Sequence, residues 1–445
     1  MKSLMRPTLR LLPLSLAAAF AAAPAQAQSL LELYQAARDH DAAYQSARAQ
    51  NDAAKYRAEQ ARAGLLPTAG VSATRSETMQ GNTASTPSRR EFGTANGSVT
   101  LSQPLYRPAN LAAFEQGKRQ ADAAQAQLTT ASQDLIIRVS QAYFDVLSAQ
   151  DTLAFVQAQK VAVGEQLASA RRNFEVGTAT ITDTREAQAR FDLVQAQEIA
   201  AENDLRVRKL ALDTVTGRTN AKPQPLASPL TLPEPAPADV NTWVQQAEEA
   251  SPTIAQARLG LEVARLETDK AKAGHLPTLD LSASRGVTHN LGGSTTVNAN
   301  SRFAATQVGV TLNIPLFAGF STQNRIRETL SLEEKAQADL DNARRTVAQA
   351  TRTAYFGLVS GAGQVRALEA AEASSQSALD ANRLGYQVGV RINIDVLNSQ
   401  SQLFQTKRDL AVARYNVLMG QLKLRQANGS LKPEDVTQIN ALLAR

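Results

Sequence analysis

The sequence predicts an α+β fold built from two tandem repeats, each with a helix, a β-hairpin and a long helical hairpin. Three observations carry this prediction: a long heptad stripe, an internal repeat over most of the chain, and paired segments of alternating apolar residues. The 445 residues include no cysteine, so neither disulfides nor a lipidated N-terminal cysteine is available. Aromatic residues make up only 5%, which favours close packing of helices with small side chains over one bulky core.

The N-terminus, residues 1–27, has the pattern of a secretory signal peptide. Three basic residues, Lys2, Arg6 and Arg10, precede an apolar run from 11 to 23, and the small-x-small site of 25–27 follows. Removing these three charges lowers the formal net charge from +6 to +3, which is too little to indicate nucleic-acid binding. We therefore expect an exported chain that starts at Gln28.

A heptad stripe of apolar residues runs from 128 to 170. Steps of four and three residues select Leu128, Ser132, Leu135, Val139, Ala142, Val146, Ala149, Leu153, Val156, Lys160, Val163, Leu167 and Ala170. Only Ser132 and Lys160 interrupt it. Such a repeat is typical of a coiled coil, and at about 1.5 Å per residue it spans roughly 60 Å. A long solid coiled coil is one interpretation of this stripe alone, and a helical hairpin is the other.

Most of the chain is an internal duplication. Four segments recur at an offset that drifts only from 210 to 212 residues: 63–68 at 273–278, 104–106 at 315–317, 142–144 at 354–356, and 174–177 at 386–389. An offset that steady indicates two copies of one structural unit.

The repeat divides the chain into residues 28–220 and 240–430. Between them lies a proline-rich linker, 221–239, and a tail, 431–445, follows. In the first repeat we predict strands at about 65–79 and 96–106 and long helices at about 108–175 and 182–216. In the second we predict strands at about 276–287 and 303–316 and long helices at about 321–385 and 395–427, with polar loops between the strands of each pair. Glu198 is the exception in the heptad pattern of the helix over 182–216.

The predicted strands alternate apolar and polar residues. Val308, Val310, Leu312 and Ile314 would share one face, and the residues between them the other. A soluble sheet with one buried face fits this pattern, and so does a membrane barrel. After the leader, no apolar run is long enough for a transmembrane helix. Since four strands are too few to close a barrel, a membrane location requires several copies, and three copies would supply about twelve strands.

Three blocks and the duplicated plan carry a family resemblance. Residues 141–147, 274–281 and 413–418 resemble the TolC family of outer-membrane efflux and secretion proteins, and the resemblance covers nearly all of the chain after the leader. It implies an α+β membrane protein: a homotrimer with a 12-stranded barrel in the outer membrane, continued by a helical tunnel across the periplasm. It also implies docking onto an inner-membrane transporter through a periplasmic adaptor, for multidrug efflux or type I protein secretion.

One aspartate lies near the start of the last long helix in each repeat. Asp183 with Glu186 fits a capping box, and Asp395 occupies the repeat-related place with Asn398 one turn on. N-capping is the ordinary interpretation of both aspartates. The resemblance implies that Asp395 belongs to an acidic ring at the closed periplasmic entrance, which would attract cations. Because the family has a second aspartate where this chain has Asn398, we expect a weaker cation preference and a weaker divalent block.

A gate is implied by the same resemblance. Tyr386 and Arg391 match residues that in the family link a movable inner hairpin to the neighbouring outer one, with Thr182 and Asp183 as partners. Ordinary surface polarity in a loop is the alternative. Since one such bond contributes only about 1 kcal/mol or less at an exposed site, a gate needs several of them, repeated by symmetry.

No catalytic constellation is visible in the sequence. The three histidines, His40, His275 and His289, are isolated from one another, and no known nucleophile or metal motif occurs. The sequence therefore predicts no enzyme, cofactor or metal site. The remaining functional alternative to an exit duct is a soluble periplasmic coiled-coil adaptor or scaffold.

Overall fold

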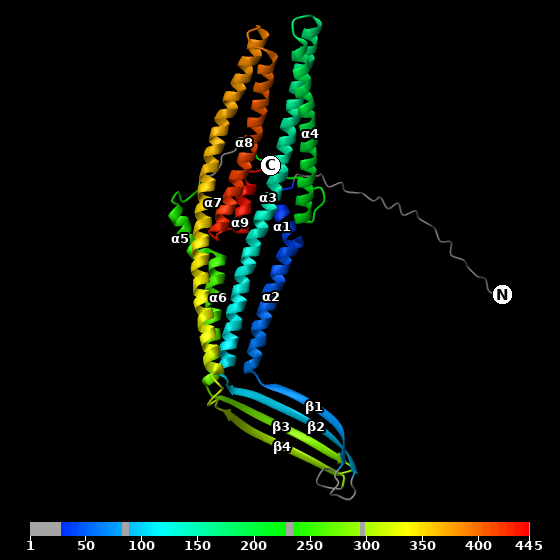
Figure 1. Cartoon of the computed structure of the whole chain (residues 1–445), viewed down its shortest axis with the longest axis vertical. Coiled ribbons are helices and arrows are strands. Elements are labelled where there is room, and N and C mark those ends of the chain that lie inside the picture. Colours follow the sequence, from blue (N-terminus) through cyan, green and yellow to red (C-terminus); the bar gives the residue numbers. More distant parts are fainter. Residues whose placement is uncertain (1–27, 82–88, 228–234, 294–298, 445) are drawn as a thin grey trace, which may run out of the picture.

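A computed structural model describes residues 28–81, 89–227, 235–293 and 299–444 of the chain. The molecule is a long rod with a curved sheet at one end and two helical hairpins at the other (Figure 1). The signal peptide predicted over 1–27 lies outside the described residues, and so does the 228–234 part of the linker.

Each repeat contributes the same elements in the same order. The first consists of α1 (Leu30–His40), α2 (Ala42–Arg62), β1 (Thr68–Gly81), β2 (Arg89–Tyr106), α3 (Pro108–Glu175) and α4 (Ile181–Thr216). The second consists of α5 (Val240–Ala250), α6 (Pro252–Lys272), β3 (Thr278–Leu291), β4 (Ser301–Asn313), α7 (Ser321–Gln387) and α8 (Asn393–Ala427), and α9 (Pro433–Asn440) follows. None of the described helices combines the length and the apolar run needed to cross a membrane.

The heptad stripe of α3 forms an interior seam. Eight of its thirteen positions are buried: Leu135, Val139, Val146, Ala149, Val156, Val163, Leu167 and Ala170. Its distal part packs on Ala187 and Val194 of α4, so the stripe builds a hairpin within the chain. Lys160 and Glu198, the exceptions in the patterns of α3 and α4, pair with each other, with Nζ and Oε2 2.5 Å apart. The charged exceptions of the two facing helices are therefore partners of each other.

Two helices, α3 and α7, run the whole length of the helical part of the rod. In the half near the sheet, α2, α3, α6 and α7 lie side by side in this order, and in the distal half the order is α4, α3, α8 and α7. Thus α8 continues the position of α6 between α3 and α7 (Figure 1). At mid-height, α1 and α9 pack against α3, α4 and α8 around the largest apolar core, which includes Tyr143, Phe144 and Leu418. The proline-rich linker is held there, since Gln224 N donates to the Tyr143 hydroxyl at 2.9 Å.

The four strands form one antiparallel sheet in the order β1, β2, β3, β4. The strands extend further into the predicted polar loops than the sequence indicated: β1 reaches Gly81, β2 begins at Arg89, and β3 reaches Leu291. Small polar pairs such as Ser76 with Thr94 continue the ladder without an apolar pattern that would reveal it. At the other end β4 stops at Asn313, before Pro315, whose missing N–H cannot join a ladder.

Candidate functional site

Both helical hairpins end in the same turn, far from the sheet. Gly177 and Gly389 adopt positive φ angles of 78° and 79°, a conformation that only glycine adopts without strain. Gly177 N donates to Phe174 O at 3.0 Å, and Gly389 N donates to Tyr386 O at 3.1 Å, so each glycine closes the last helical turn. All six residues predicted for the gate and the acidic ring lie within about ten residues of these turns.

The first turn of α4 holds Thr182 and Asp183. Thr180 is the N-cap, and its hydroxyl accepts from Asp183 N at 3.2 Å while the Asp183 carboxylate accepts from Thr180 N at 3.0 Å. The capping box is therefore Thr180 with Asp183, one turn earlier than the Asp183–Glu186 pair predicted from sequence, because α4 begins at Ile181. Thr182 is exposed beside it.

Tyr386 connects the two hairpins of the chain. Its hydroxyl accepts a hydrogen bond from Asn173 Nδ2 at 3.2 Å, which joins the end of α7 to the end of α3. The Tyr386 ring is half-buried and packs against the apolar cluster of Leu379, Val396 and Leu403 within its own hairpin. Tyr386 thus joins the α7–α8 hairpin to the α3–α4 hairpin through a single neutral bond. Following the family resemblance, we call these the inner and the outer hairpin.

Arg391 and Asp395 pair on one side of the inner tip. Arg391 Nη1 lies 3.7 Å from Asp395 Oδ2, with 58% of the arginine side chain exposed. The arginine stem folds over Gly385, where a Cβ would meet Arg391 Cγ at 2.7 Å. Within the described chain the polar side-chain contacts of Tyr386 and Arg391 are with Asn173 and Asp395. Their links to Thr182 and Asp183 stay predictions.

Asn398 also reaches the outer hairpin. Arg190 Nη2 of α4 donates to Asn398 Oδ1 at 2.9 Å. The position at which the family resemblance implies a second acidic ring is thus occupied by an amide that accepts from a cation. Asp395, one turn earlier, is half-buried and carries the only carboxylate of the two positions.

A polar stripe on α3 faces α8 and the end of α7. Gln159, Gln166 and Asn173 follow one another at intervals of seven residues, beside the apolar stripe that faces α4. Arg408 Nη1 donates to Gln159 Oε1 at 3.1 Å, and Asn173 bonds Tyr386 as described. Burial lowers the pKa of Arg408, which has only an amide in contact across this boundary. The sequence showed the apolar stripe but gave no sign of which helix the polar stripe would meet.

The buried amide of Asn393 is the centre of this boundary. Asn393 is 1% exposed at the start of α8, accepts from Gln166 Nε2, and donates to the backbone oxygen of Asp183 at 3.5 Å. Apolar contacts accompany it, since Leu397 and Ile394 of α8 pack against the core of the α3–α4 hairpin. No ion pair joins the two hairpins within 108–216 and 321–427, which the structure describes throughout.

Further from the tips on the same boundary, Tyr415 of α8 donates to Asp151 Oδ2 of α3 at 2.6 Å. Burial raises the pKa of Asp151, and the hydrogen bond from Tyr415 offsets only part of the rise. Burial and the nearby carboxylate both raise the pKa of Tyr415. Asp151 is therefore a carboxylate with little solvent around it, held between α3 and α8, which belong to different hairpins.

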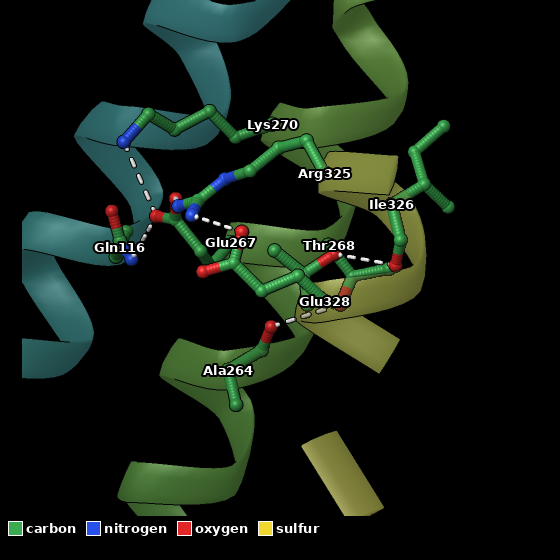
Figure 2. Close-up of polar contacts among 9 residues, drawn as sticks. Gln116, Ala264, Glu267, Thr268, Lys270, Arg325, Ile326 and Glu328 are labelled. Carbon is green, nitrogen blue, oxygen red and sulfur yellow. Dashed lines mark hydrogen bonds and ion pairs between the residues drawn. The ribbon is translucent and has the colours of Figure 1, made fainter. Parts of the chain in front are cut away.

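The half near the sheet has a different kind of polar contact. Figure 2 shows Glu267 of α6 at its centre, accepting from Arg325 Nη2 of α7 at 2.6 Å, Gln116 Nε2 of α3 at 3.0 Å and Lys270 Nζ at 3.2 Å. Burial tends to raise the pKa of Glu267, but these hydrogen bonds together lower it below its ordinary value. One carboxylate thus fastens three helices with charge-assisted bonds.

Comparisons with known proteins agree with this architecture. The outer membrane efflux protein family matches residues 33–218 and 243–430. The chain is 33% identical to outer membrane protein TolC of Vibrio cholerae over 97% of this chain and 98% of that protein. It is 32% identical to the proteases secretion protein PrtF of Dickeya chrysanthemi, over 94% of this chain and 91% of that protein.

A solved structure, the outer membrane protein VceC of Vibrio cholerae, has the same fold. It superposes with a TM-score of 0.75 at 20% identity, covering 90% of this chain and 96% of that one. The chain belongs to the outer membrane efflux protein family. This is a family of outer-membrane transport channels rather than enzymes, so the alternative of a soluble periplasmic scaffold is not supported.

Proposed function

We propose that the protein is a passive exit duct of the outer membrane, used for tripartite multidrug efflux, type I protein secretion or both, and gated at its periplasmic helical end. The observation that carries this proposal is the division of the rod into a four-stranded sheet at one end and two helical hairpins at the other. A chain of this shape forms one sector of a wall.

We propose that three copies close the wall. The sheet has free edges at β1 and β4, and such edges are not tolerated in lipid. Two copies would give a barrel too narrow for passage, whereas three give twelve strands and an open lumen. Exposed apolar side chains on the long helices supply surfaces for neighbouring copies: Leu193, Ile199 and Leu210 of α4, and Phe356 and Leu384 of α7. Outer-membrane lipid would surround the barrel.

The helical end is the proposed docking site for other proteins. Both tips expose apolar residues that no element of the chain covers: Val176 is 72% exposed, Val388 64% and Val390 75%. Exposed apolar residues gathered at one end indicate a protein partner. In the family context this partner is a periplasmic adaptor, which connects the duct to an inner-membrane transporter.

The proposed gate is the boundary between the two hairpins. It is held by hydrogen bonds with an amide or hydroxyl on at least one side, each of which contributes roughly 1 to 3 kcal/mol. Three copies would bring Asp395 together as a ring of carboxylates that attracts cations, and Asn398 would keep this ring single. An adaptor that binds one arrangement of the hairpins better than the other can then open the passage.

Substitution at the tip tests the proposal. We expect Tyr386→Phe and Arg391→Ala each to raise the single-channel conductance in planar bilayers. Tyr386→Phe removes the bond to Asn173 of the other hairpin, and Arg391→Ala removes the proposed link to Thr182 and Asp183. Arg345→Ala, on the exposed side of α7 far from the tip, is the matched control and should conduct as the wild type does. Unchanged conductance in both tip variants would contradict the gate assignment.

A further inference from the structure

One face of the sheet is apolar. Directly paired residues of antiparallel strands lie on the same face, and successive residues of a strand lie on opposite faces. The register pairs Leu279 with Leu312, Leu281 with Val310 and Ala283 with Val308. The opposite face carries the intervening polar residues, such as Asp280 paired with Thr311. Under the proposed function, the apolar face meets lipid.

A row of basic residues lies on this apolar face. The register aligns Arg75 of β1, Ala95 of β2, His289 of β3 and Arg302 of β4 across the whole sheet. Each is an even number of residues from the apolar positions of its own strand, so all four share the lipid-facing side. Arg285 of β3, four residues closer to the helices, lies on the same side. All three basic side chains of the row are exposed. The cost of a charged residue on a lipid face is largest at the bilayer midplane and smallest near the headgroups.

The height of the row matches the edge of the membrane. Ten residues separate His289 from Leu279, the first apolar position of β3. At about 3.4 Å per residue and a tilt of about 40°, the row stands about 26 Å above that position. The apolar band of such barrels is about 25 Å tall. Since the helices begin at the opposite end of the strands, the row lies at the outer surface of the membrane (Figure 1).

A hollow lies between two members of the row. Its volume is about 460 Å³, and its lining includes Arg75 and His289 at the sides and Ala95 and Gly97 on the floor. A side chain at Gly97 would meet nothing within 4 Å, so the hollow is open above the glycine. Glu77, 3.5 Å from Arg75 and 70% exposed, is the one acidic neighbour in an ion pair; within the described residues, His289 and Arg302 form none.

We propose that the row of Arg75, His289 and Arg302, with the hollow between its first two members, binds the phosphate groups of a phosphorylated glycolipid in the outer leaflet. The proposal rests on the proposed function, because it needs the sheet to span the outer membrane. Guanidinium groups bind phosphate oxygens through paired hydrogen bonds. The row lies at the end of the strands away from the helices, which is the level of the outer, glycolipid leaflet and not of the phospholipid leaflet on the side of the helices.

Lipid retention by the purified trimer in nanodiscs tests this assignment. Native mass spectrometry would count bound bisphosphorylated lipid A, the same glycolipid without its phosphates, and phosphatidylglycerol as a second anionic lipid. We expect the wild type to retain the phosphorylated glycolipid preferentially. At about fivefold per arginine near a charged membrane surface, R75Q/R302Q should lower its apparent affinity more than tenfold.

Three further variants sharpen the result. R75K/R302K keeps the charge and should retain most of the binding, and G97L fills the hollow without changing charge and should weaken it. R345Q/R352Q removes two arginines from α7, outside the sheet, and should bind as the wild type does. Equal retention of both forms of lipid A, or of phosphatidylglycerol, would overturn the glycolipid assignment.

The same preparations separate this proposal from the one on which it rests. If wild type and variants all conduct in planar bilayers but show no dependence on phosphate, only the headgroup site is refuted. If the wild type forms no channel at all, the proposed function itself fails.

Discussion

The two halves of the rod hold their helices together in different ways. Near the sheet, α6 lies between α3 and α7 and is tied to both by charged groups. Arg119 pairs with Glu262 at 3.0 Å, and Arg325 pairs with Glu267 at 2.6 Å. In the distal half α8 occupies the same position, but its bonds to α3 have an uncharged amide or hydroxyl on at least one side, such as Gln159 with Arg408.

This difference follows the duplication of the chain. In the sheet-proximal half ion pairs fasten the two repeats across their boundary, whereas in the distal half the ion pairs stay inside each hairpin. Lys160 with Glu198 joins α3 to α4, and Arg414 with Glu369 joins α8 to α7. The distal hairpins are therefore expected to move as rigid units while the half near the sheet stays fixed, and a gate belongs at the end where the units can separate.

Removing the Glu267 carboxylate from the half near the sheet, which we call the base of the rod, is expected to have the largest effect on stability. Glu267→Ala leaves Arg325, Lys270 and Gln116 without their common acceptor, and we expect a loss of about 2 kcal/mol per chain. Thermal unfolding followed by circular dichroism measures this loss. Glu328→Ala removes only an exposed partner of Arg325 and serves as the control.

The base variant also tests the contrast between the halves. Conductance of Glu267→Ala should equal that of the wild type, because the base does not move in the gating that we propose. A rise as large as that of Arg391→Ala would show that the base takes part in opening.

A smaller effect is expected inside the outer hairpin. Lys160→Met leaves Glu198, whose side chain is 16% exposed, without its partner, and we expect a cost of about 1 kcal/mol. The double variant K160M/E198L removes both charges and should recover most of that stability, since the surrounding seam is apolar. A matched change in the exposed pair of Lys335 with Asp339 should have almost no effect. A double variant less stable than K160M would contradict the packing described for the seam.

The smallest effect is a pH dependence at Asp151. Because burial raises its pKa in the folded chain, the folded state binds this proton more tightly than the unfolded state does. The ionised carboxyl then disfavours folding at neutral pH, and this penalty disappears as the pH falls through the raised pKa towards the ordinary value of 3.8.

Asp151→Asn is accordingly expected to be more stable than the wild type at neutral pH, with an advantage that shrinks on acidification. Unfolding temperatures of both proteins, measured from about pH 8 down to about pH 4, give this difference directly. An advantage that grows in acid would have the opposite sign to linkage through a raised pKa.

The sequence predicted those features that depend on a repeating local pattern. The stripe on α3 was visible because its period matches the helix, and even its exception at Lys160 has a counterpart at Glu198. The far ends of the strands were missed, since Ser76, Thr94 and their neighbours pair through the backbone and show no alternation. The local pattern therefore predicted which elements occur better than it predicted the residues at which they begin and end.

The site was predictable only in part, and for a different reason. Family resemblance indicated Tyr386, Arg391 and Asp395, and the capping role of Thr180 depends on where α4 begins. The buried amide of Asn393 depends on which helices meet. Gln166 and Asn393 are 227 residues apart in the sequence. No local pattern relates them, and only the arrangement of α3 beside α8 brings them together.

A disulfide across the hairpin boundary tests the central claim most directly. The chain has no cysteine, so Gln166→Cys with Asn393→Cys introduces one pair at side chains that touch. Combined with Arg391→Ala, we predict low conductance when oxidised and high conductance after reduction. The same lock at Gln116 and Glu267, also combined with Arg391→Ala, should conduct highly in both states. If the oxidised boundary lock conducts as well as Arg391→Ala alone, separation of the two hairpins is not what opens the duct.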